Sequence, residues 1–321
     1  MKVKVFFTVD VEVWCGAWDD LDSRFPEAFR RYIYGSTKRG QYGLPRTLER
    51  LNHYGLKGVF FTEPLFSRRF GHAALEEIVG LVLAAGQEIQ LHLHTEWADE
   101  AEPPLVPGLR DKRQHLWMFD CAEQELLIRL GLDLLEKAGG KGINAFRAGS
   151  FGMNIETWRA LAKIGIPFDS SFNGLFASTR EDLASYVTVH QPMDVAGVWS
   201  YPMTIFEDAR GHLRHAQLGA CSFSELEWLL WRAAEEEWAS VVLLSHNFEL
   251  MNQAKTAPDP VVTKRFERLC RFLASNTDAF ETSGFQGLIP QPRAQAVDIP
   301  RAGISVTLCR MAEQALRRLY G

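Results

Sequence analysis

The sequence VKVFFTVDVE at residues 3–12 is typical of a buried β-strand that ends in two acidic side chains. Its β-branched and aromatic residues favour an extended chain. Successive side chains of a strand alternate between its two faces, so Asp10 and Glu12 should project the same way, and Val9 and Val11 the other way. Two carboxylates on one face repel each other unless a cation, an arginine or a proton lies between them. A strand end that simply turns towards water would also explain the pair.

Beyond this strand, apolar strand patterns and helical patterns take turns along the chain. We predict strands at residues 57–62, 88–94, 145–149, 167–169, 197–202 and 240–246, and helices at residues 46–54, 72–85, 121–138, 155–164, 224–237 and 263–277. Between residues 14 and 42 we expect irregular, largely polar chain. The alternation indicates an α/β fold of parallel strands joined by right-handed crossovers, closed as a barrel or open as a sheet.

The length of 321 residues suits one large α/β domain with an appendage. The pattern changes after Phe285: residues 286–302 contain three prolines, and residues 304–319 resume helical spacing with Arg310, Arg317 and Arg318 on the polar side. We therefore predict a barrel domain at 1–285 and a linker with an amphipathic C-terminal helix at 286–321. The helix is expected to dock on its own barrel; a second subunit, giving a homo-oligomer, and a membrane surface are the alternatives.

Composition excludes several classes of function. The formal net charge of -5 provides no broad positive field, so nucleic acid is not an expected partner. The five cysteines lack CxxC spacing and suggest reduced thiols. The first residues do not resemble a signal peptide, and no apolar stretch reaches the ~20 residues of a transmembrane helix. We expect a soluble, cytoplasmic protein.

Two histidines end the strand predicted at residues 88–94. Alternation places His92, His94 and Glu96 on one face, and neutral imidazole is a frequent ligand of divalent metals. A lone buried histidine is usually a satisfied core residue, but two on one strand favour a metal site.

Two further strands end in candidate site residues. Arg147 precedes a glycine turn and could hold a carboxylate through paired N–H donors, although a surface arginine that bridges helices is equally compatible. His246 ends the apolar strand at residues 240–246 and could protonate a leaving amine, or only donate to a neighbouring carbonyl. Backbone N–H groups at Ser150 and Phe151 could face a developing oxyanion.

Six blocks in order resemble a known family. They are TVDVE (residues 8–12), GLPRTLERLNHYGLKGVFFT (43–62), GQEIQLHLHTEW (86–97), FRAGSFG (146–152), GIPFDSSF (165–172) and LLSHNFE (243–249). Together they resemble the motifs of the polysaccharide deacetylase superfamily (NodB-homology, carbohydrate esterase family 4), over roughly residues 1–285. GIPFDSSF is similar to the Asp-Ser-Ser motif that lines the substrate groove in that family.

The resemblance implies a distorted (β/α)7 barrel and a metal-dependent hydrolase. Its substrate would be an N-acylated amino sugar of a surface polysaccharide or its precursor, from which it would remove an acetyl or related acyl group. By resemblance, Asp10 is the general base, His92 a metal ligand, Arg147 the residue that orients Asp10, and His246 the general acid.

Two departures from the family pattern change the expected metal ligands. Val11 replaces the usual second aspartate, and Glu96 occupies the usual place of the second histidine. Glu12 and His94 are therefore the expected substitutes beside His92. This donor set predicts one divalent cation, with zinc the expected ion.

Two other functions stay open at this point. The same barrel could hydrolyse a cyclic amide, as some relatives do, or the chain could be an inactive carbohydrate-binding relative with a broken metal site. If Trp14, Trp18, Trp97 and Trp117 are exposed along a groove, they could stack on sugar rings.

Overall fold

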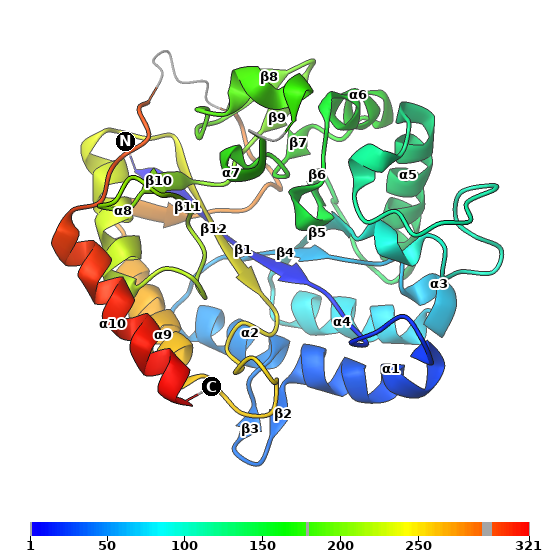
Figure 1. The fold of residues 1–321 in the computed structure, drawn as a ribbon, viewed down its shortest axis with the longest axis horizontal. Coiled ribbons are helices and arrows are strands. Elements are labelled where there is room, and N and C mark those ends of the chain that lie inside the picture. The colour runs from blue at the N-terminus through cyan, green and yellow to red at the C-terminus, as the bar shows by residue number, and fades with distance from the viewer. Residues whose placement is uncertain (1, 178–179, 291–296, 321) are drawn as a thin grey trace.

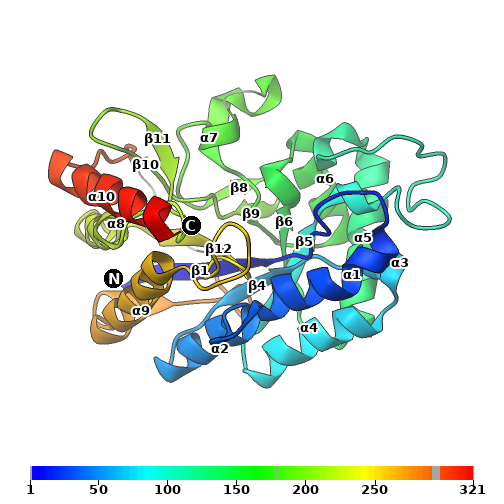
Figure 2. The same ribbon diagram turned by 60° about the horizontal axis from the view of Figure 1, so that its bottom comes forward.

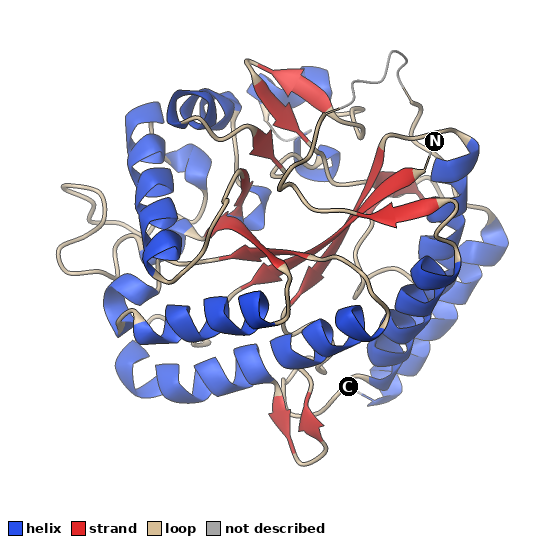
Figure 3. Cartoon of the chain, turned by 180° about the vertical axis from the view of Figure 1, so that it is seen from behind, coloured by secondary structure: helices blue, strands red, loops and turns tan. Residues whose placement is uncertain are grey.

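The structure is a computed structural model that describes residues 2–177, 180–290 and 297–320. Strands occupy its centre and helices cover the outside (Figure 1 and Figure 3). Hydrogen-bonded neighbours in the main sheet follow the order β12 (Ser240–His246), β1 (Val3–Val11), β4 (Val59–Thr62), β5 (Glu88–Leu93), β6 (Ala145–Ala148), β7 (Phe168–Asp169), β9 (Val198–Ser200) and β8 (Met193–Val195). The first seven are parallel, and β8 pairs antiparallel with β9.

Irregular chain joins the two edges of the curled sheet. Leu218 donates its backbone N–H to the carbonyl of Leu244 in β12 (2.8 Å), and Leu244 donates to Ala216 (2.9 Å). The antiparallel hairpin of β10 (Ile205–Glu207) and β11 (Leu213–His215) lies just before this contact in the chain. The predicted α/β fold, a distorted barrel with a helical C-terminal segment, is confirmed.

Helices connect the strands on the outside of the barrel. They are α2 (Leu44–His53), α3 (Ser67–Phe70), α4 (Ala73–Ala84), α5 (Cys121–Lys137), α6 (Ile155–Ile164), α7 (Gly174–Ala177), α8 (Phe223–Glu235) and α9 (Pro260–Ser275). Side chains cap four of them: Asp120 for α5, Asn154 for α6, Ser222 for α8 and Asp259 for α9. The capping side chains satisfy first-turn N–H groups and fix where each crossover begins.

One helical region was not predicted. α1 (Leu21–Phe29) and the adjoining helical turn η1 (Arg30–Tyr34) occupy part of the segment expected to be irregular, followed by the small hairpin of β2 (Ser36–Thr37) and β3 (Gly40–Gln41). Leu21, Phe25 and Phe29 recur at helical spacing and pack on the core, but the intervening polar residues and Pro26 obscure the pattern. The prediction of irregular chain was therefore wrong here.

The alternation of β1 determines which side chains enter the barrel. Its odd-numbered valines and Phe7 pack between the sheet and the helices, in the larger of two apolar clusters. Phe6 faces inward and packs with side chains of the neighbouring strands and with Phe285. Thr8 and Asp10 follow Phe6 at intervals of two, so they also face inward. The strand thus runs from an apolar interior to a carboxylate at its carboxyl end.

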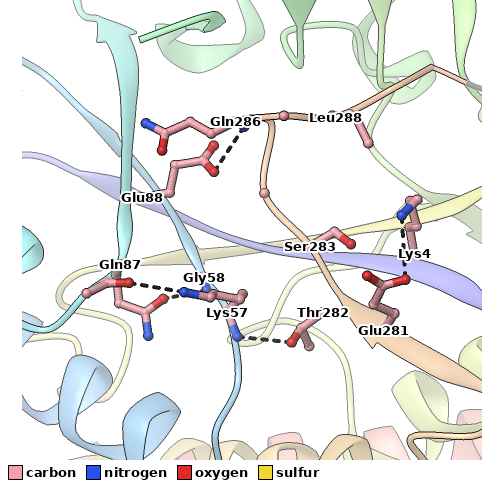
Figure 4. A pocket seen from close by; sticks show the side chains of 13 residues that line it. Lys4, Lys57, Gly58, Gln87, Glu88, Glu281, Thr282, Ser283, Gln286 and Leu288 are labelled. Carbon is pink, nitrogen blue, oxygen red and sulfur yellow. Dashed lines mark hydrogen bonds and ion pairs between the residues drawn. The ribbon is translucent and has the colours of Figure 1, made fainter. Parts of the chain in front are cut away.

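The opposite end of the barrel is closed by the chain after β13 (Phe280–Thr282), which pairs with the first residues of β1. Glu88 accepts a hydrogen bond from the backbone N–H group of Phe285 (2.7 Å). It also accepts one from Gln286 (3.1 Å), and Lys4 pairs with Glu281 (3.5 Å) (Figure 4). A cavity of about 390 Å³ remains beside these contacts. It lies at the amino ends of the strands, away from the edge where parallel α/β folds build their sites.

The C-terminal helix α10 (Ile304–Tyr320) lies against α8 and α9 (Figure 1). Arg310 contacts Asp208 (2.9 Å) and Glu225 (3.0 Å), and Arg317 pairs with Asp259, the cap of α9. Docking of the helix on its own barrel is what we expected, but these two arginines face the barrel and not solvent. The division at residue 285 stays a prediction, and residues 291–296 of the predicted linker lie outside the described residues. Among the helices that the structure describes, none has the length and apolar character needed to cross a membrane.

The ion pairs of Arg310 predict how the tail contributes to stability. Asp208 and Glu225 are buried, so Arg310→Met would remove a cation that contacts both carboxylates. We expect the free energy of unfolding at pH 7 to fall by about 3 kcal/mol, the scale for breaking a buried ion pair. Urea denaturation measures it, with Arg318→Met on the exposed side of α10 as the control. Equal stability of the two variants would contradict the docking role.

Candidate metal centre and active site

The predicted site residues converge at the carboxyl ends of four strands. Asp10 is in β1, where it is the register partner of His246 in β12. His92 in β5 is the register partner of Arg147 in β6. Glu12 lies just beyond the end of β1, and His94 just beyond the end of β5. The structure brings all six predicted residues together.

The carboxylate of Glu12 faces both imidazoles. Its Oε1 lies 3.1 Å from Nε2 of His92 and 2.9 Å from Nε2 of His94. Its Oε2 accepts a hydrogen bond from the indole of Trp14 (2.6 Å). All three potential ligands are buried, and one donor atom of each lies within 4.8 Å of the others. This cluster of one oxygen and two nitrogen donors could hold a metal ion.

The other nitrogen of each imidazole is already occupied. Nδ1 of His92 lies 2.8 Å from the carbonyl oxygen of Arg147, which can only accept, so this nitrogen carries the proton. Nδ1 of His94 lies 3.3 Å from the carboxylate of Glu96. Neutral rings with these tautomers turn their Nε2 lone pairs towards the oxygen of Glu12. A cation among these three atoms, or a second proton on a ring, removes the repulsion, and the arrangement matches the partners that metal-binding histidines have.

Glu96 does not join the cluster itself. It supports His94 from behind, as an acceptor for Nδ1. Glu96 therefore occupies the position of the family's second histidine, and from there it orients His94.

Charge in the cluster shifts two pKa values strongly. Burial raises the pKa of Glu12, but the charge of His94 and hydrogen bonds from both imidazoles outweigh burial and hold it well below its usual range. Burial lowers the pKa of His94, yet Glu12 and Glu96 raise it well above its usual value. The cluster therefore requires positive charge, whether a cation or a proton supplies it.

Arg147 holds Asp10. Its Nη1 lies 2.6 Å from Oδ1 of Asp10 and donates to the hydroxyl of Thr8 (2.9 Å), while Nε and Nη2 donate to the carbonyl and hydroxyl of Ser170 (3.0 and 2.9 Å). The guanidinium also lies over the ring of Phe61 at 4.3 Å. The other oxygen of Asp10 lies 3.9 Å from Nε2 of His92. Asp10 is thus clamped on one side and open towards the cluster on the other.

The Asp-Ser-Ser motif does not line a groove, contrary to the expectation from the resemblance. Asp169, Ser170 and Ser171 are fully buried. Asp169 accepts from the indole of Trp158 (2.9 Å), and Ser171 accepts from the backbone of Ala148 (2.9 Å). The motif therefore supports Arg147 and strand β6 through buried hydrogen bonds.

His246 is paired with Glu249, a residue for which no role was predicted. Its Nδ1 lies 2.8 Å from Oε2 of Glu249, and Gln217 approaches the same carboxylate (3.4 Å). Burial lowers the pKa of His246, but the hydrogen bond and charge of Glu249, with smaller contributions from Glu12 and Asp10, raise it to about 9. One donor atom of His246 also lies within 4.8 Å of those of Asp10 and Glu12. Glu249 follows His246 by three residues, and this spacing was the signal in the sequence that could have predicted the pair.

The tryptophans only partly match their predicted placement. Trp97 is buried and packs against Trp18, with ring centroids 4.9 Å apart, so it cannot stack on a sugar. Trp14 is half-buried and packs edge-on against His94 (4.7 Å). Trp117 is 38% exposed. Residues 14–18, Leu21 and Trp97 line a cavity of about 210 Å³.

The turn after β6 is strained. Ser150 and Phe151 both adopt positive φ, 52° and 53°. Non-glycine residues rarely occupy this region, and such strain concentrates at functional sites. Gly149 is required beside them, because a Cβ there would lie 2.7 Å from Nδ1 of His94.

Known structures share this fold. No family model matches the sequence, and no curated protein is significantly similar to it. A structure from Mycobacterium smegmatis, described as a candidate polysaccharide deacetylase, matches 92% of this chain and 94% of its own with a TM-score of 0.56 and 17% identity. The 4-α-glucanotransferase of Thermococcus litoralis matches 94% of this chain and 42% of its own, with a TM-score of 0.54 and 11% identity.

A family 4 carbohydrate esterase from Streptomyces lividans, in complex with acetate, matches 88% of this chain and 92% of its own, with a TM-score of 0.43 and 12% identity. The Mycobacterium smegmatis structure confirms the predicted resemblance to the polysaccharide deacetylases at the level of the fold. A glucanotransferase shares that fold, so activity must be argued from the site.

The pairing of His246 with Glu249 predicts a measurable pKa change. In chelator-treated protein, Glu249→Gln should lower the pKa of His246 from about 9 towards the usual value near 6.5. NMR titration of the imidazole measures this pKa, and Glu136→Gln, at an exposed position of α5, should leave the pKa unchanged. Since the folded pKa is raised, the pair stabilises the fold fully below about pH 6.5, and that contribution is lost as pH rises through about 9. An unchanged pKa would show that Glu249 does not hold the proton on His246.

Proposed function

We propose that this chain is a metal-dependent hydrolase that removes an acetyl or related N-acyl group from an amino sugar. The observation that carries the proposal is the carboxylate of Glu12 facing two imidazole Nε2 atoms, with Asp10 and His246 on either side. A site that only packs the core would not bring a cation-requiring cluster, a clamped carboxylate and a protonated imidazole together.

The metal would be held by Glu12, His92 and His94. The donor set of two imidazoles and one carboxylate suits zinc, which we propose as the ion. When bound, such a cation polarises an acyl carbonyl and makes a water molecule more acidic. The partners of the ligands, Arg147 and Glu96, keep the Nε2 atoms directed at the site.

Asp10 acts as the general base in this proposal. Arg147 fixes one carboxylate oxygen at 2.6 Å and leaves the other directed towards the cluster, where it can accept a proton from the attacking water. The clamp also prevents Asp10 from rotating away during the reaction. The base is therefore positioned before the substrate arrives.

His246 acts as the general acid. Glu249 raises the pKa of His246, which favours the doubly protonated imidazole, and accepts the proton on Nδ1. The proton on Nε2 is then available for the amine that leaves. Backbone N–H groups near Ser150 are the proposed donors to the oxyanion.

The proposed substrate is an N-acylated sugar of a surface polysaccharide or of its precursor. Its support is the shared fold. The ring of Trp117 is 38% exposed, but His115 (5.6 Å) and Arg180 (4.6 Å) already contact it. Cytoplasmic location, and a homo-oligomer formed through α10, also remain proposals.

Replacing the base tests the mechanism. Asp10→Asn keeps the shape of the side chain but removes its basicity, so turnover should fall by about 10²–10⁴-fold, the usual contribution of a general base. Release of acetate from N-acetylglucosamine oligomers measures it. Metal content should stay at the wild-type level, and Asp278→Asn on the surface should retain full activity. Normal turnover of Asp10→Asn would remove Asp10 from this role.

Metal analysis separates the proposal from its alternatives. Wild-type protein should contain about one divalent ion per chain by mass spectrometry, and a double variant, His92→Ala with His94→Ala, should contain none. His212→Ala, at an exposed histidine outside the cluster, is the matched control. A wild-type protein without metal, and with no response to chelator, would favour the inactive carbohydrate-binding protein. Ring opening of small cyclic amides without acetate release would favour the cyclic-amide hydrolase.

A further inference from the structure

A second cavity, of about 580 Å³, lies between α2 and α9 and shares no residue with the metal cluster. The two helices lie side by side (Figure 2). Basic side chains dominate the cavity wall: Arg39, Arg46, Arg50, Lys264, Arg268 and Arg271, against one acidic residue, Glu267. The whole chain has a formal net charge of -5, so this groove reverses the sign of the protein locally. Its volume is in the range of small-molecule sites.

The basic residues form two rows along the groove. Arg46 and Arg50 are one helical turn apart on α2. Lys264, Arg268 and Arg271 extend over two turns of α9, a length of about 10 Å at 1.5 Å per residue. Charges spread over this length suit an elongated anion better than a single phosphate ion.

The acidic residues near the groove do not provide hydrogen-bond partners for all of its buried polar atoms. Glu49 bonds to Arg46 (2.8 Å) and to Arg50 (2.5 Å), through their terminal nitrogens. The Nε atoms of both arginines, and the hydroxyl of Thr263 on the facing helix, are shielded from solvent without a hydrogen-bond partner. Buried polar atoms normally have partners. Three atoms without one in the same groove are consistent with a ligand that supplies acceptors.

The row on α9 is also short of counterions. Lys264, Arg268 and Arg271 form no ion pair with any acidic side chain in the described part of the chain. Arg268 instead lies over the ring of Phe223 at 4.1 Å. Glu267 lies among them on α9 but pairs with Arg50 (3.7 Å), so positive charge is in excess along this wall.

We propose that the groove between α2 and α9 binds a soluble ligand that carries a run of phosphate groups. Guanidinium groups match phosphate oxygens through paired N–H donors, and five of the six cations that line the groove are arginines. Leu250 and Pro258 at one end belong to the loop that follows His246, and no lining residue of the groove belongs to the metal cluster. This inference does not depend on the proposed hydrolase activity.

Calorimetric titration of the full chain with sodium tripolyphosphate tests the proposal. We expect saturable binding in 50 mM NaCl that weakens strongly in 300 mM NaCl, because salt screens the contacts. The double variant Lys264→Glu with Arg271→Glu should bind at least 10-fold more weakly. Lys141→Glu, the same charge change at an exposed site outside the groove, should bind as the wild type does.

Three results would overturn the proposal. They are no binding of tripolyphosphate to the wild type, equal affinity of the double variant and the Lys141→Glu control, and binding to phosphatidylglycerol vesicles without binding of tripolyphosphate. Circular dichroism verifies that each variant is folded. If the double variant is not, Arg39→Glu on the exposed hairpin turn provides the same comparison, with weaker binding expected.

Discussion

The buried guanidinium of Arg147 is the interaction on which the candidate site depends. Its side chain clamps Asp10, and its backbone carbonyl accepts the Nδ1 proton of His92. One residue therefore sets the orientation of the proposed base and the tautomer of a proposed ligand. Its charge is stable inside the barrel only because Asp10, Thr8 and Ser170 use its donors, since an unpaired buried charge is very unfavourable. Movement of any of these partners would therefore disturb both the proposed base, Asp10, and the proposed ligand, His92.

The sequence predicted the barrel and the convergence of strand ends because both follow from local patterns. The period of two in β1 places Asp10 on the inner face, and parallel strands bring their carboxyl ends to one edge. Ser170 comes from a distant segment and left a weaker signal, so its buried support of Arg147 was mistaken for a groove wall. Glu249 lies only three residues after His246, but no role was predicted for it. α1 was missed because its apolar positions are diluted by charged residues and interrupted by Pro26. These contacts depend on tertiary packing, which overrides local propensity.

The two departures from the family pattern offset each other in space. Val11 cannot ligate a metal and packs in the outer core, but Glu12 reaches the cluster from the next position. The second imidazole comes from His94, two residues before its usual place, and the carboxylate that occupies that place bonds to its Nδ1. A site that had merely lost its ligands would be expected to lack these partners. Here Glu12, His92 and His94 each have one donor or acceptor fixed by a neighbour and one directed inward, which is the arrangement that metal binding requires.

Since a glucanotransferase shares the fold, the barrel alone does not determine the chemistry. The chemistry depends instead on the charge arrangement at the carboxyl ends of the strands. Glu12 is held ionised beside His92 and His94, and Glu249 keeps a proton on His246 at neutral pH. The proposed base and the proposed acid have opposite partners: a permanent cation for Asp10 and a carboxylate for His246. Binding alone would not need this opposition, which is why we propose a hydrolase.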